Sequence, residues 1–158
     1  CMNVQQSVVL VKPDALQRGL LGEIIHRFER KGMKLVALKM MRLTDEILNA
    51  WYSHHQDKAF FADLKKFMQS SPIVAMLWEG IDAIKIVRRI VGSTSGRDAE
   101  AGSIRGDFSI SQQLNLIHAS DSDASAAKER KLVFIDEDVI DWQSADECLF
   151  YSREELAE

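Results

Sequence analysis

His118 is the residue whose surroundings point most clearly to chemistry. It ends a short apolar run in the segment Asn115-Leu116-Ile117-His118-Ala119-Ser120-Asp121-Ser122, where polar side chains follow it and Ser122 can cap a helix. A neutral imidazole in such a place can act as a nucleophile or as a general base. A buried structural histidine would give the same local pattern, so the run alone leaves both interpretations open.

The other three histidines give no comparable signal. His26 falls in the middle of a predicted helix and is expected at the surface. His54 and His55 are adjacent, so their side chains point in different directions and cannot easily chelate one metal ion from a helix. His118 is therefore the candidate for a reactive histidine.

Several cations could converge near His118. Lys12 ends the first predicted strand, Arg88 and Arg89 lie in a helix that enters an irregular loop, and Arg105 closes that loop. Arginine suits bidentate phosphate binding, and lysine supplies a point charge. Each could equally be a solvated surface charge. If the first and fourth strands are neighbours, Lys12 approaches His118 and a phosphate site results.

Absent motifs exclude several common classes of protein. The chain has no G-x-x-x-x-G-K-[ST] loop, no G-x-G-x-x-G after a strand, and neither H-R-D nor D-F-G, which excludes P-loop and protein-kinase chemistry. It also lacks H-E-x-x-H and the aromatic signature of RNA-recognition domains. A phosphate site here must therefore be of another kind.

Composition describes a globular chain of about one domain. The 158 residues are 46% hydrophobic and 28% charged, with 20 Lys and Arg against 24 Asp and Glu, a net charge of −4. Such a mildly acidic chain is a poor candidate for wrapping nucleic acid. The two cysteines, Cys1 and Cys148, fit a reducing cytoplasm, and no apolar run reaches membrane-spanning length. The N-terminal residues have no signal-peptide pattern.

Hydrophobic periodicity predicts four strands and five helices. The strands are expected at 7–11, 34–42, 72–78 and 114–118, and the helices at about 20–31, 44–53, 60–70, 82–91 and 122–134. Thr44, Asp82 and Ser122 are the expected N-caps, while Lys12-Pro13-Asp14 and the segment 55–58 are expected to be turns.

The order of these elements predicts an α+β fold. It is of the ferredoxin-like β-α-β-β-α-β type, with an antiparallel sheet, helices on one face and an inserted helical hairpin. The loop from residue 92 to 106 has no apolar period and is expected to be a long functional loop without structure of its own. One domain is predicted over 1–158, with a core at about 7–134 and an acidic tail at about 135–158.

Six segments together resemble the nucleoside diphosphate kinase family. They are Val11-Lys12-Pro13-Asp14, Gln17-Arg18-Gly19-Leu20, Phe60-Phe61, Trp78-Glu79-Gly80, and the runs 103–108 and 115–122. One tetrapeptide would be a weak signal. The ordered set, with family-like spacing from about residue 7 to 134, is highly specific.

The resemblance implies transfer of the terminal phosphoryl group from a nucleoside triphosphate such as ATP to nucleoside diphosphates, which maintains nucleoside triphosphate pools. By position, His118 resembles the nucleophile that becomes phosphohistidine in a ping-pong reaction, and Glu129 and Ser120 resemble the residues that orient it. The resemblance also implies phosphate and ribose contacts at Lys12, Tyr52, Arg88, Thr94, Arg105 and Asn115, and a base clamp at Phe60 and Leu64. Mg²⁺ is implied as the cofactor, held mainly by the nucleotide phosphates, with Asp121 in contact through water.

Three departures from the family pattern concern rate and assembly. Ala119 replaces the usual glycine, and its Cβ would restrict the backbone beside the nucleophile if φ were positive. Ala59 replaces the usual proline, and the 95–102 loop lacks prolines common in the family. Two alternatives stay open: a nucleotide- or RNA-binding regulatory module with little catalysis, and an unrelated phosphatase on the same kind of sheet.

The resemblance further implies a homo-oligomer, a hexamer in preference to a tetramer. A proline-free loop with Gly96 and Gly102 needs something to order it, and a neighbouring subunit would do so. The tail segment Leu149-Phe150-Tyr151 is expected to be apolar surface without a partner in its own chain. On the same view, Gly96→Pro is expected to raise stability by about 0.4–1 kcal/mol if the local φ allows proline.

Overall fold

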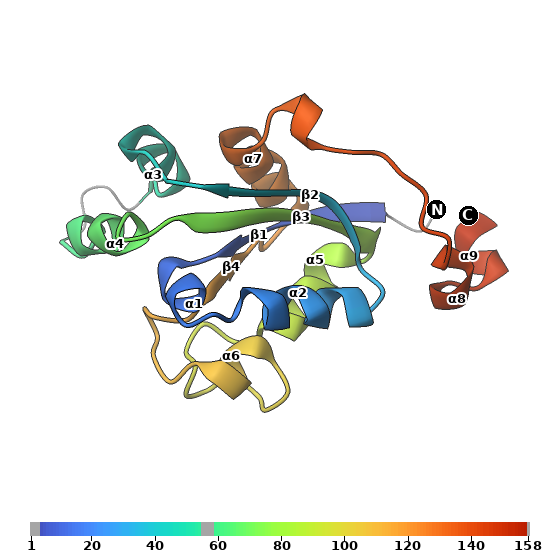
Figure 1. The fold of residues 1–158 in the computed structure, drawn as a ribbon, viewed down its shortest axis with the longest axis horizontal. Helices are drawn as coiled ribbons and strands as arrows, with labels where there is room; N and C mark the ends of the chain where they lie inside the picture. The colour runs from blue at the N-terminus through green and yellow to red at the C-terminus, as the bar shows by residue number, and fades with distance from the viewer. Residues whose placement is uncertain (1–3, 55–58, 158) are drawn as a thin grey trace.

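A four-stranded antiparallel sheet forms the centre of the computed structural model, which describes residues 4–54 and 59–157 (Figure 1). The strand order is β2-β3-β1-β4. The inner strand β1 (Val4–Val11) pairs with β3 (Ile73–Ile81) on one side and with β4 (Ile117–Ala119) on the other, and β2 (Lys34–Met41) lies beyond β3. The fourth strand is thus aligned directly on the first.

Helices fill the connections between the strands. In chain order they are α1 (Pro13–Gln17), α2 (Leu21–Arg30), α3 (Asp45–Trp51), α4 (Phe61–Met68), α5 (Ala83–Val91), α6 (Ile104–Phe108), α7 (Asp123–Val133), the short 3₁₀ turn η1 (Asp136–Asp138), α8 (Glu147–Phe150) and α9 (Arg153–Ala157). The α+β fold of ferredoxin-like order, with the hairpin α3–α4 inserted between β2 and β3, is confirmed. The predicted turn at 55–58 lies outside the described residues.

Helices cover both faces of the sheet, so the expectation of one covered face is wrong. Val9 and Val11 of β1 face a core shared with α2 and α5, whereas Val8 and Leu10 face a second core shared with α3 and α7. Figure 1 shows α3 and α7 above the sheet and α2, α5 and α6 below it. The uninterrupted apolar run 8–11 follows from this arrangement, because a strand that is buried on both sides needs no alternation.

Two of the three predicted helix caps are confirmed. The Thr44 hydroxyl accepts a hydrogen bond from the Ile47 N–H at 3.2 Å, and the Ser122 hydroxyl accepts one from the Ser125 N–H at 3.1 Å. Asp82 precedes α5 but makes no side-chain cap, because its backbone adopts a left-handed conformation with φ of 54°. Its side chain therefore does not satisfy the first turn of α5.

The periodicity missed the short helices α1, α6, α8 and α9 and the 3₁₀ turn η1. The segment predicted as a turn after Lys12 continues into α1, where Pro13 occupies the first helical position. The loop expected to lack structure contains the start of α6, whose N-cap Ser103 accepts from the Gly106 N–H at 3.0 Å. Helices of five residues are too short to show a helical period.

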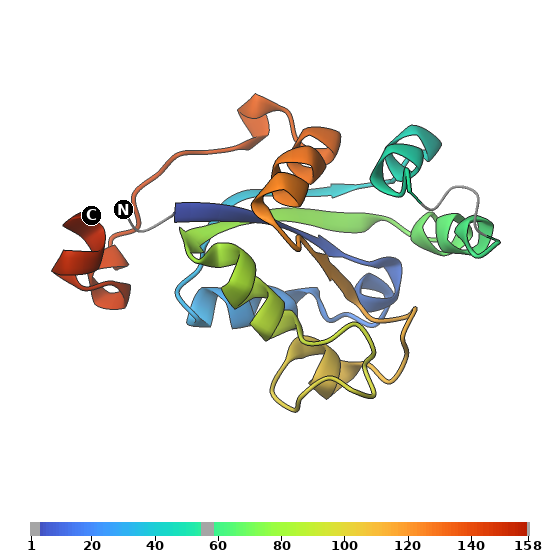
Figure 2. The same ribbon diagram turned by 180° about the vertical axis from the view of Figure 1, so that it is seen from behind.

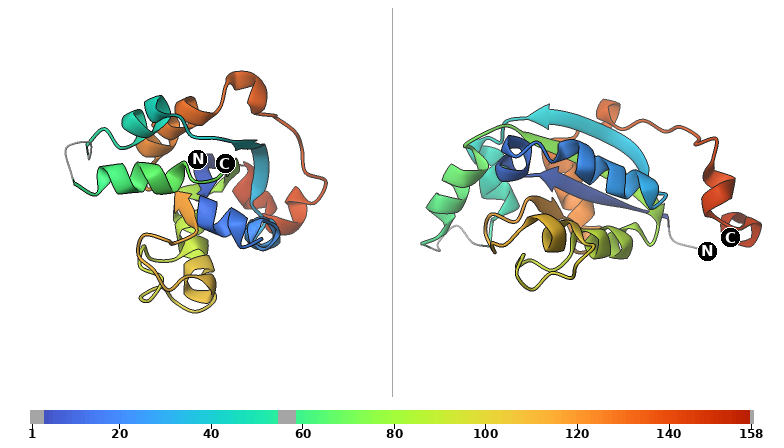
Figure 3. Two further views of the ribbon diagram at one scale, coloured as in Figure 1. Left: turned by 60° about the vertical axis from the view of Figure 1, so that its left-hand side comes forward. Right: turned by 60° about the horizontal axis from the view of Figure 1, so that its bottom comes forward.

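The 92–116 segment is ordered by its own chain, which corrects the argument that a neighbouring subunit must order it. Arg27 forms an ion pair with Asp107 at 2.6 Å and donates to the Gly102 carbonyl at 2.9 Å. The Gly96 N–H donates to the Ser111 carbonyl at 3.0 Å. Figure 3 shows this segment projecting from the sheet beside α5.

Gly96→Pro is now expected to destabilise the protein, contrary to the expectation from sequence. Proline removes the Gly96 N–H and its hydrogen bond to the Ser111 carbonyl, which keeps the bond from the Ser109 hydroxyl at 3.2 Å, at a cost of about 0.5–1.5 kcal/mol. A side chain at position 96 would also overlap the backbone of Ser109. Thermal unfolding checks the result: Gly96→Pro should lower Tm. The matched control is Gly22→Ala in α2, where no atom lies within 4 Å of the added Cβ, and it should leave Tm equal or higher. An unchanged or raised Tm for Gly96→Pro would contradict this account.

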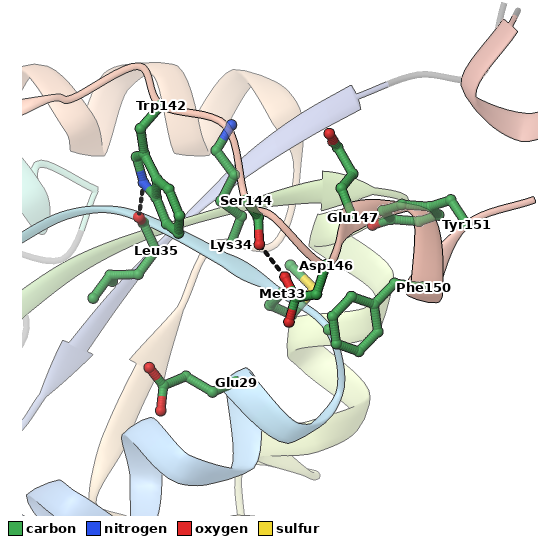
Figure 4. Close-up of a pocket in the computed structure, with 11 residues that line it drawn as sticks. Glu29, Met33, Lys34, Leu35, Trp142, Ser144, Asp146, Glu147, Phe150 and Tyr151 are labelled. Carbon is green, nitrogen blue, oxygen red and sulfur yellow. Dashed lines mark hydrogen bonds between the residues drawn. The ribbon is translucent and has the colours of Figure 1, made fainter. Parts of the chain in front are cut away.

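The tail returns to the body of its own chain, which corrects the expectation for 149–151. The Phe150 ring lies so close over Gly32 that a Cβ there would clash with it, and Gly32 also has a φ of 91°. The Tyr151 hydroxyl accepts from the Ile81 N–H at 3.3 Å, while Leu149 stays 81% exposed. The tail and the start of β2 line a cavity of about 180 Å³. Figure 4 shows its lining residues, with the Trp142 indole N–H donating to the Leu35 carbonyl. Among the described residues, none of the helices has the length and apolar character needed to cross a bilayer.

Candidate active site

The pairing of β1 with β4 positions His118. Leu10 lies opposite His118 in the register, so Lys12 follows two residues beyond it at the end of β1. Figure 2 shows β4 as the edge strand nearest the viewer, leading into α7. The predicted proximity of the first and fourth strands is confirmed, and it places Lys12 and His118 in the wall of one cavity.

This cavity has a volume of about 310 Å³ and a polar lining. Its residues are Lys12, Arg88, Val91, Gly92, Thr94, Arg105, Asn115, Ile117, His118, Ala119 and Asp121. Of the twelve residues singled out in the sequence, seven therefore line it, including Asp121. Ser120 and Glu129 lie behind His118, whereas Tyr52, Phe60 and Leu64 belong to the α3–α4 hairpin and are absent from the lining.

Asn115 ties Lys12 to the loop that follows α5. The Lys12 ammonium donates to Asn115 Oδ1 at 2.7 Å, and Asn115 Nδ2 donates to the carbonyls of Thr94 at 2.8 Å and Gln112 at 2.9 Å. Both amide hydrogens of Asn115 are thus used within the chain, while Oδ1 retains a second lone pair. Asn115 consequently holds Lys12 in place and can still accept one hydrogen bond from a ligand.

Arg105 binds three backbone carbonyls around the cavity. Its Nε donates to Asn115 O at 3.1 Å, one terminal nitrogen donates to Gly92 O at 3.0 Å, and the other donates to Ile117 O at 2.6 Å. The residue is 8% exposed. A guanidinium has five N–H groups, so two remain for a ligand after these three bonds. Arg105 therefore joins the loop, α6 and β4 while it keeps its charge in the cavity.

The crowding of cations shifts their pKa values. Burial, and then the charge of Arg105, lower the pKa of Lys12 to about 8, although Asp14 opposes this shift. Burial, and then Arg88, lower the pKa of Arg105 to about 10. Both groups favour an anion beside them, because an anion would offset their mutual repulsion. The cavity is built to receive negative charge.

Glu129 and Ser120 hold the His118 ring. His118 Nε2 lies 2.9 Å from Glu129 Oε2, and the Ser120 hydroxyl donates to Glu129 Oε1 at 2.7 Å. Glu129 is only 9% exposed. An ionised carboxylate can only accept, so Nε2 carries the proton and the Nδ1 lone pair is left for chemistry.

Trp51 is a neighbour of His118 that the sequence did not reveal. The two rings meet edge to face, with centroids 5.1 Å apart. Trp51 is the last residue of α3, and the contact requires that the inserted hairpin fold over the end of β4. Its position in a helical stretch far from His118 offered no signal for this contact.

Tyr52, Phe60 and Leu64 of the α3–α4 hairpin are not part of the cavity lining. Phe60 is 50% exposed, and Tyr52 packs its ring against Phe61 with centroids 6.2 Å apart. Burial, and then the charge of Glu129, raise the pKa of Tyr52 to about 12. The Tyr52 phenol therefore stays protonated and is a hydrogen-bond donor at neutral pH.

Ala119 sits in ordinary strand geometry. Positive φ values among the described non-glycine residues occur at Asp82 and Leu116, and Ala119 is not one of them. Ala119 pairs with Val9 in the sheet. The concern that a Cβ beside His118 restricts the backbone is therefore removed.

Comparison with known proteins gives one consistent result. The sequence model of the family described as nucleoside diphosphate kinase matches residues 5–139. A nucleoside diphosphate kinase of Staphylothermus marinus is 54% identical over 89% of this chain and all of its own length. A solved structure of a halophilic nucleoside diphosphate kinase from Halobacterium salinarum, in complex with CDP, is 41% identical with a TM-score of 0.92, over 95% of this chain and 100% of that chain. A nucleoside diphosphate kinase family protein from Babesia bovis is 44% identical with a TM-score of 0.90, over 93% of this chain and 99% of its own. By sequence and by fold, the chain belongs to the nucleoside diphosphate kinase family.

Proposed function

We propose that the enzyme moves the terminal phosphoryl group of a nucleoside triphosphate to a nucleoside diphosphate through a phosphohistidine at His118. The observation that carries this proposal is the setting of the ring. Its Nε2 is held by Glu129 while the rest of the side chain borders a cavity lined by Lys12, Arg88 and Arg105. A nucleophile in a cation-lined cavity suits attack on a phosphate.

The reaction divides into two matched halves. In the first, the Nδ1 lone pair attacks the terminal phosphorus, an N–P bond forms, and the P–O bond to the nucleoside diphosphate breaks with its electron pair on the leaving oxygen. In the second, a terminal oxygen of another nucleoside diphosphate attacks the same phosphorus and the N–P bond breaks. The covalent intermediate makes the kinetics ping-pong. Glu129 accepts from Nε2 throughout and keeps the ring aimed.

The cavity residues then have distinct roles in this proposal. Lys12, Arg88 and Arg105 offset the charge on the phosphate oxygens, and Thr94 supplies a hydroxyl donor. Asn115 accepts from a ribose hydroxyl through the free lone pair of Oδ1. Tyr52 donates its phenolic proton to a phosphate oxygen. All of these groups act by position and charge, which is the usual contribution of protein to phosphoryl transfer.

The base would be held on the α3–α4 hairpin. Phe60 offers an exposed ring for stacking, and Leu64 follows it one turn later in α4. Stacking alone does not test the hydrogen-bonding edge of a base, since every base has a π-face. We therefore expect several nucleoside diphosphates to be accepted.

The residues present fit Mg²⁺ that is carried by the nucleotide. Over residues 4–54 and 59–157 no cluster of three acidic, histidine or cysteine side chains could cage a metal ion. The cavity has a single carboxylate, Asp121, whose pKa is held low by a hydrogen bond from Ser125 and also by the charge of Arg88. Mg²⁺ commonly keeps its waters and binds phosphate oxygens with one or two carboxylates, and it would neutralise charge on the transferred group.

The proposal includes a cytoplasmic homo-oligomer, a hexamer in preference to a tetramer. Leu38 and Met40 of β2 are 48% and 61% exposed, which supports an interface at this part of the molecule. A regulatory module with little catalysis is not favoured, because the relatives are kinases by name over nearly their whole length. The sparse use of cysteine, with Cys1 and Cys148 far apart in the sequence, supports the cytoplasm.

One assay tests the reaction. The protein is incubated with ATP labelled at the terminal phosphate and Mg²⁺, separated from nucleotide, and then mixed with GDP. We expect labelled protein first and labelled GTP second. Release of free phosphate in place of GTP would instead identify a phosphatase, and failure to label the protein would remove the covalent intermediate.

A further inference from the structure

Leu116 adopts a backbone conformation that leucine rarely takes. Its φ is 73°, and the N–H of Ile117 donates to the carbonyl of Asn115 at 2.9 Å across it. This i to i+2 hydrogen bond around a residue with positive φ is the rare, strained form of the γ-turn. The turn stands two residues before His118, and its first member is Asn115.

Asp14 holds this turn from the first strand's side. Its Oδ2 accepts from the Leu116 N–H at 3.1 Å, and the Lys12 N–H donates to the Leu116 carbonyl at 2.9 Å. Both backbone groups of Leu116 are thus bonded to the segment 12–14. The other oxygen, Oδ1, is buried and finds no hydrogen-bond partner among the described residues.

We propose that Asp14 is a positioning residue for phosphoryl transfer: its carboxylate holds the strained turn at Leu116 and thereby sets Asn115 and His118 in their places. The proposal rests on the assignment of His118 as the nucleophile. Strained backbone persists only where the surrounding structure over-determines it. Arg105 binds the carbonyls of Asn115 and Ile117, and the Lys12 N–H binds the carbonyl of Leu116. The Leu116 N–H is the remaining backbone group of the turn, and Asp14 is its hydrogen-bond partner.

Loss of this restraint would affect both ends of the turn. A relaxed Leu116 returns to negative φ and rotates the peptide that joins it to Asn115. The side-chain amide of Asn115 then loses its hydrogen bonds to the carbonyls of Thr94 and Gln112. The Lys12 ammonium consequently loses the Asn115 Oδ1 that anchors it. His118 shifts relative to the bound phosphate, and a misplacement of about 1 Å is enough to cost roughly 10²-fold in rate.

Asp14 also acts on Lys12 through charge. Its carboxylate raises the pKa of Lys12 against the lowering caused by burial and by Arg105. The other charged or titratable groups that line the same cavity are Arg88, His118 and Asp121. Removal of the Asp14 charge therefore lowers the pKa of Lys12 below about 8, and the ammonium is lost at a lower pH.

Two substitutions separate these effects in the single-turnover labelling of the protein by ATP. Asp14→Asn keeps an acceptor for the Leu116 N–H, so the labelling rate at pH 6.5 should stay near the wild-type rate while the alkaline fall in rate moves to lower pH. Asp14→Ala removes acceptor and charge, so the rate should fall by about 10- to 100-fold. The matched control is Asp123→Ala, which removes an exposed carboxylate whose side-chain partner is Gln5, and it should leave the labelling rate unchanged.

A second background tests the strain itself. Glycine adopts positive φ freely, so a protein that carries Leu116→Gly should not need Asp14 to hold the turn. In that background, Asp14→Ala should therefore reduce the labelling rate by a smaller factor than it does in the wild-type background. The loss of the buried Leu116 side chain lowers stability, and rates are compared well below the Tm of each variant. The proposal would be overturned if Asp14→Ala reduced the labelling rate by the same factor in the wild-type and Leu116→Gly proteins. It would also be overturned if the Asp14→Ala protein were labelled at the wild-type rate.

The wild-type protein offers a measurement that needs no variant to be active. The amide proton of Leu116 should shift in the NMR spectrum as the Asp14 carboxyl is protonated, and this titration should vanish in Asp14→Asn. A Leu116 amide that ignores the Asp14 titration would overturn the proposal. If wild-type protein were not labelled by ATP at all, the proposed function would fail instead, while the titration would still report on the turn.

Discussion

Replacement of His118 by alanine is expected to abolish the phosphoryl mark on the protein and to reduce nucleotide exchange to background. The mark itself should be lost in acid and survive alkali, as a phosphoramidate should. Alanine removes the imidazole nitrogen that forms the N–P bond in the proposed mechanism, so no partial activity is expected. Labelling with ATP, followed by acid and alkaline treatment, checks the result.

The controls use the other histidines. His26 and His54 are exposed and do not line the cavity, so His26→Ala and His54→Ala should be labelled normally, as should His55→Ala. Glu129→Ala removes only the group that orients the ring, so labelling should persist at a reduced rate. Labelling that survives in His118→Ala would refute the assignment of the nucleophile. Complete inactivity of Glu129→Ala would refute its orienting role.

Arg105→Ala is expected to have the second largest effect. It removes a buried charge from the cavity lining and also releases the carbonyls of Gly92, Asn115 and Ile117. Loss of one important donor to the transition state typically costs on the order of 10²–10³ in rate. Here the geometric loss adds to the electrostatic one, so we expect kcat to fall by at least that amount and Tm to fall as well.

The substitution Arg105→Lys distinguishes the electrostatic contribution of Arg105 from its geometric one. Arg105→Lys keeps a cation, but a single ammonium cannot reach three carbonyls that a planar guanidinium spans. Its rate should therefore fall between those of wild type and Arg105→Ala. Arg89→Ala is the matched control, because Arg89 is an exposed arginine of α5 that is not in the cavity lining. A rate for Arg105→Ala within tenfold of wild type would contradict the role given to Arg105.

Much of the fold could be predicted from the sequence, because strands and helix caps leave patterns within a few neighbouring residues. The strands at 7–11, 34–42 and 72–78 coincide with β1, β2 and β3, and Thr44 and Ser122 cap the helices that they precede. The convergence of Lys12 on His118 could also be inferred, since it follows from pairing the first strand with the fourth.

The structural features that the sequence did not predict share one physical origin, which is contact between segments far apart in the chain. Leucine at 114 and 116 indicated a strand over 114–118, but Leu116 turns with positive φ and β4 is limited to 117–119. Tertiary hydrogen bonds to Asp14 and Arg105 impose that turn, and no local pattern records them. The contact of Trp51 with His118 and the return of Phe150 to Gly32 are likewise products of packing between distant segments.

The pairing of β1 with β4 has a consequence for synthesis of the chain. Lys12 and Asn115 are 103 residues apart, and Glu129 lies 11 residues beyond His118. A chain growing from the ribosome must therefore hold one edge of β1 unpaired until more than two thirds of the polypeptide has emerged. Long-range pairings of this kind are slow because loop closure precedes any gain in contacts. Labelling by ATP during translation would consequently time the last step of folding, since His118 and Lys12 are brought together only when β4 pairs with β1.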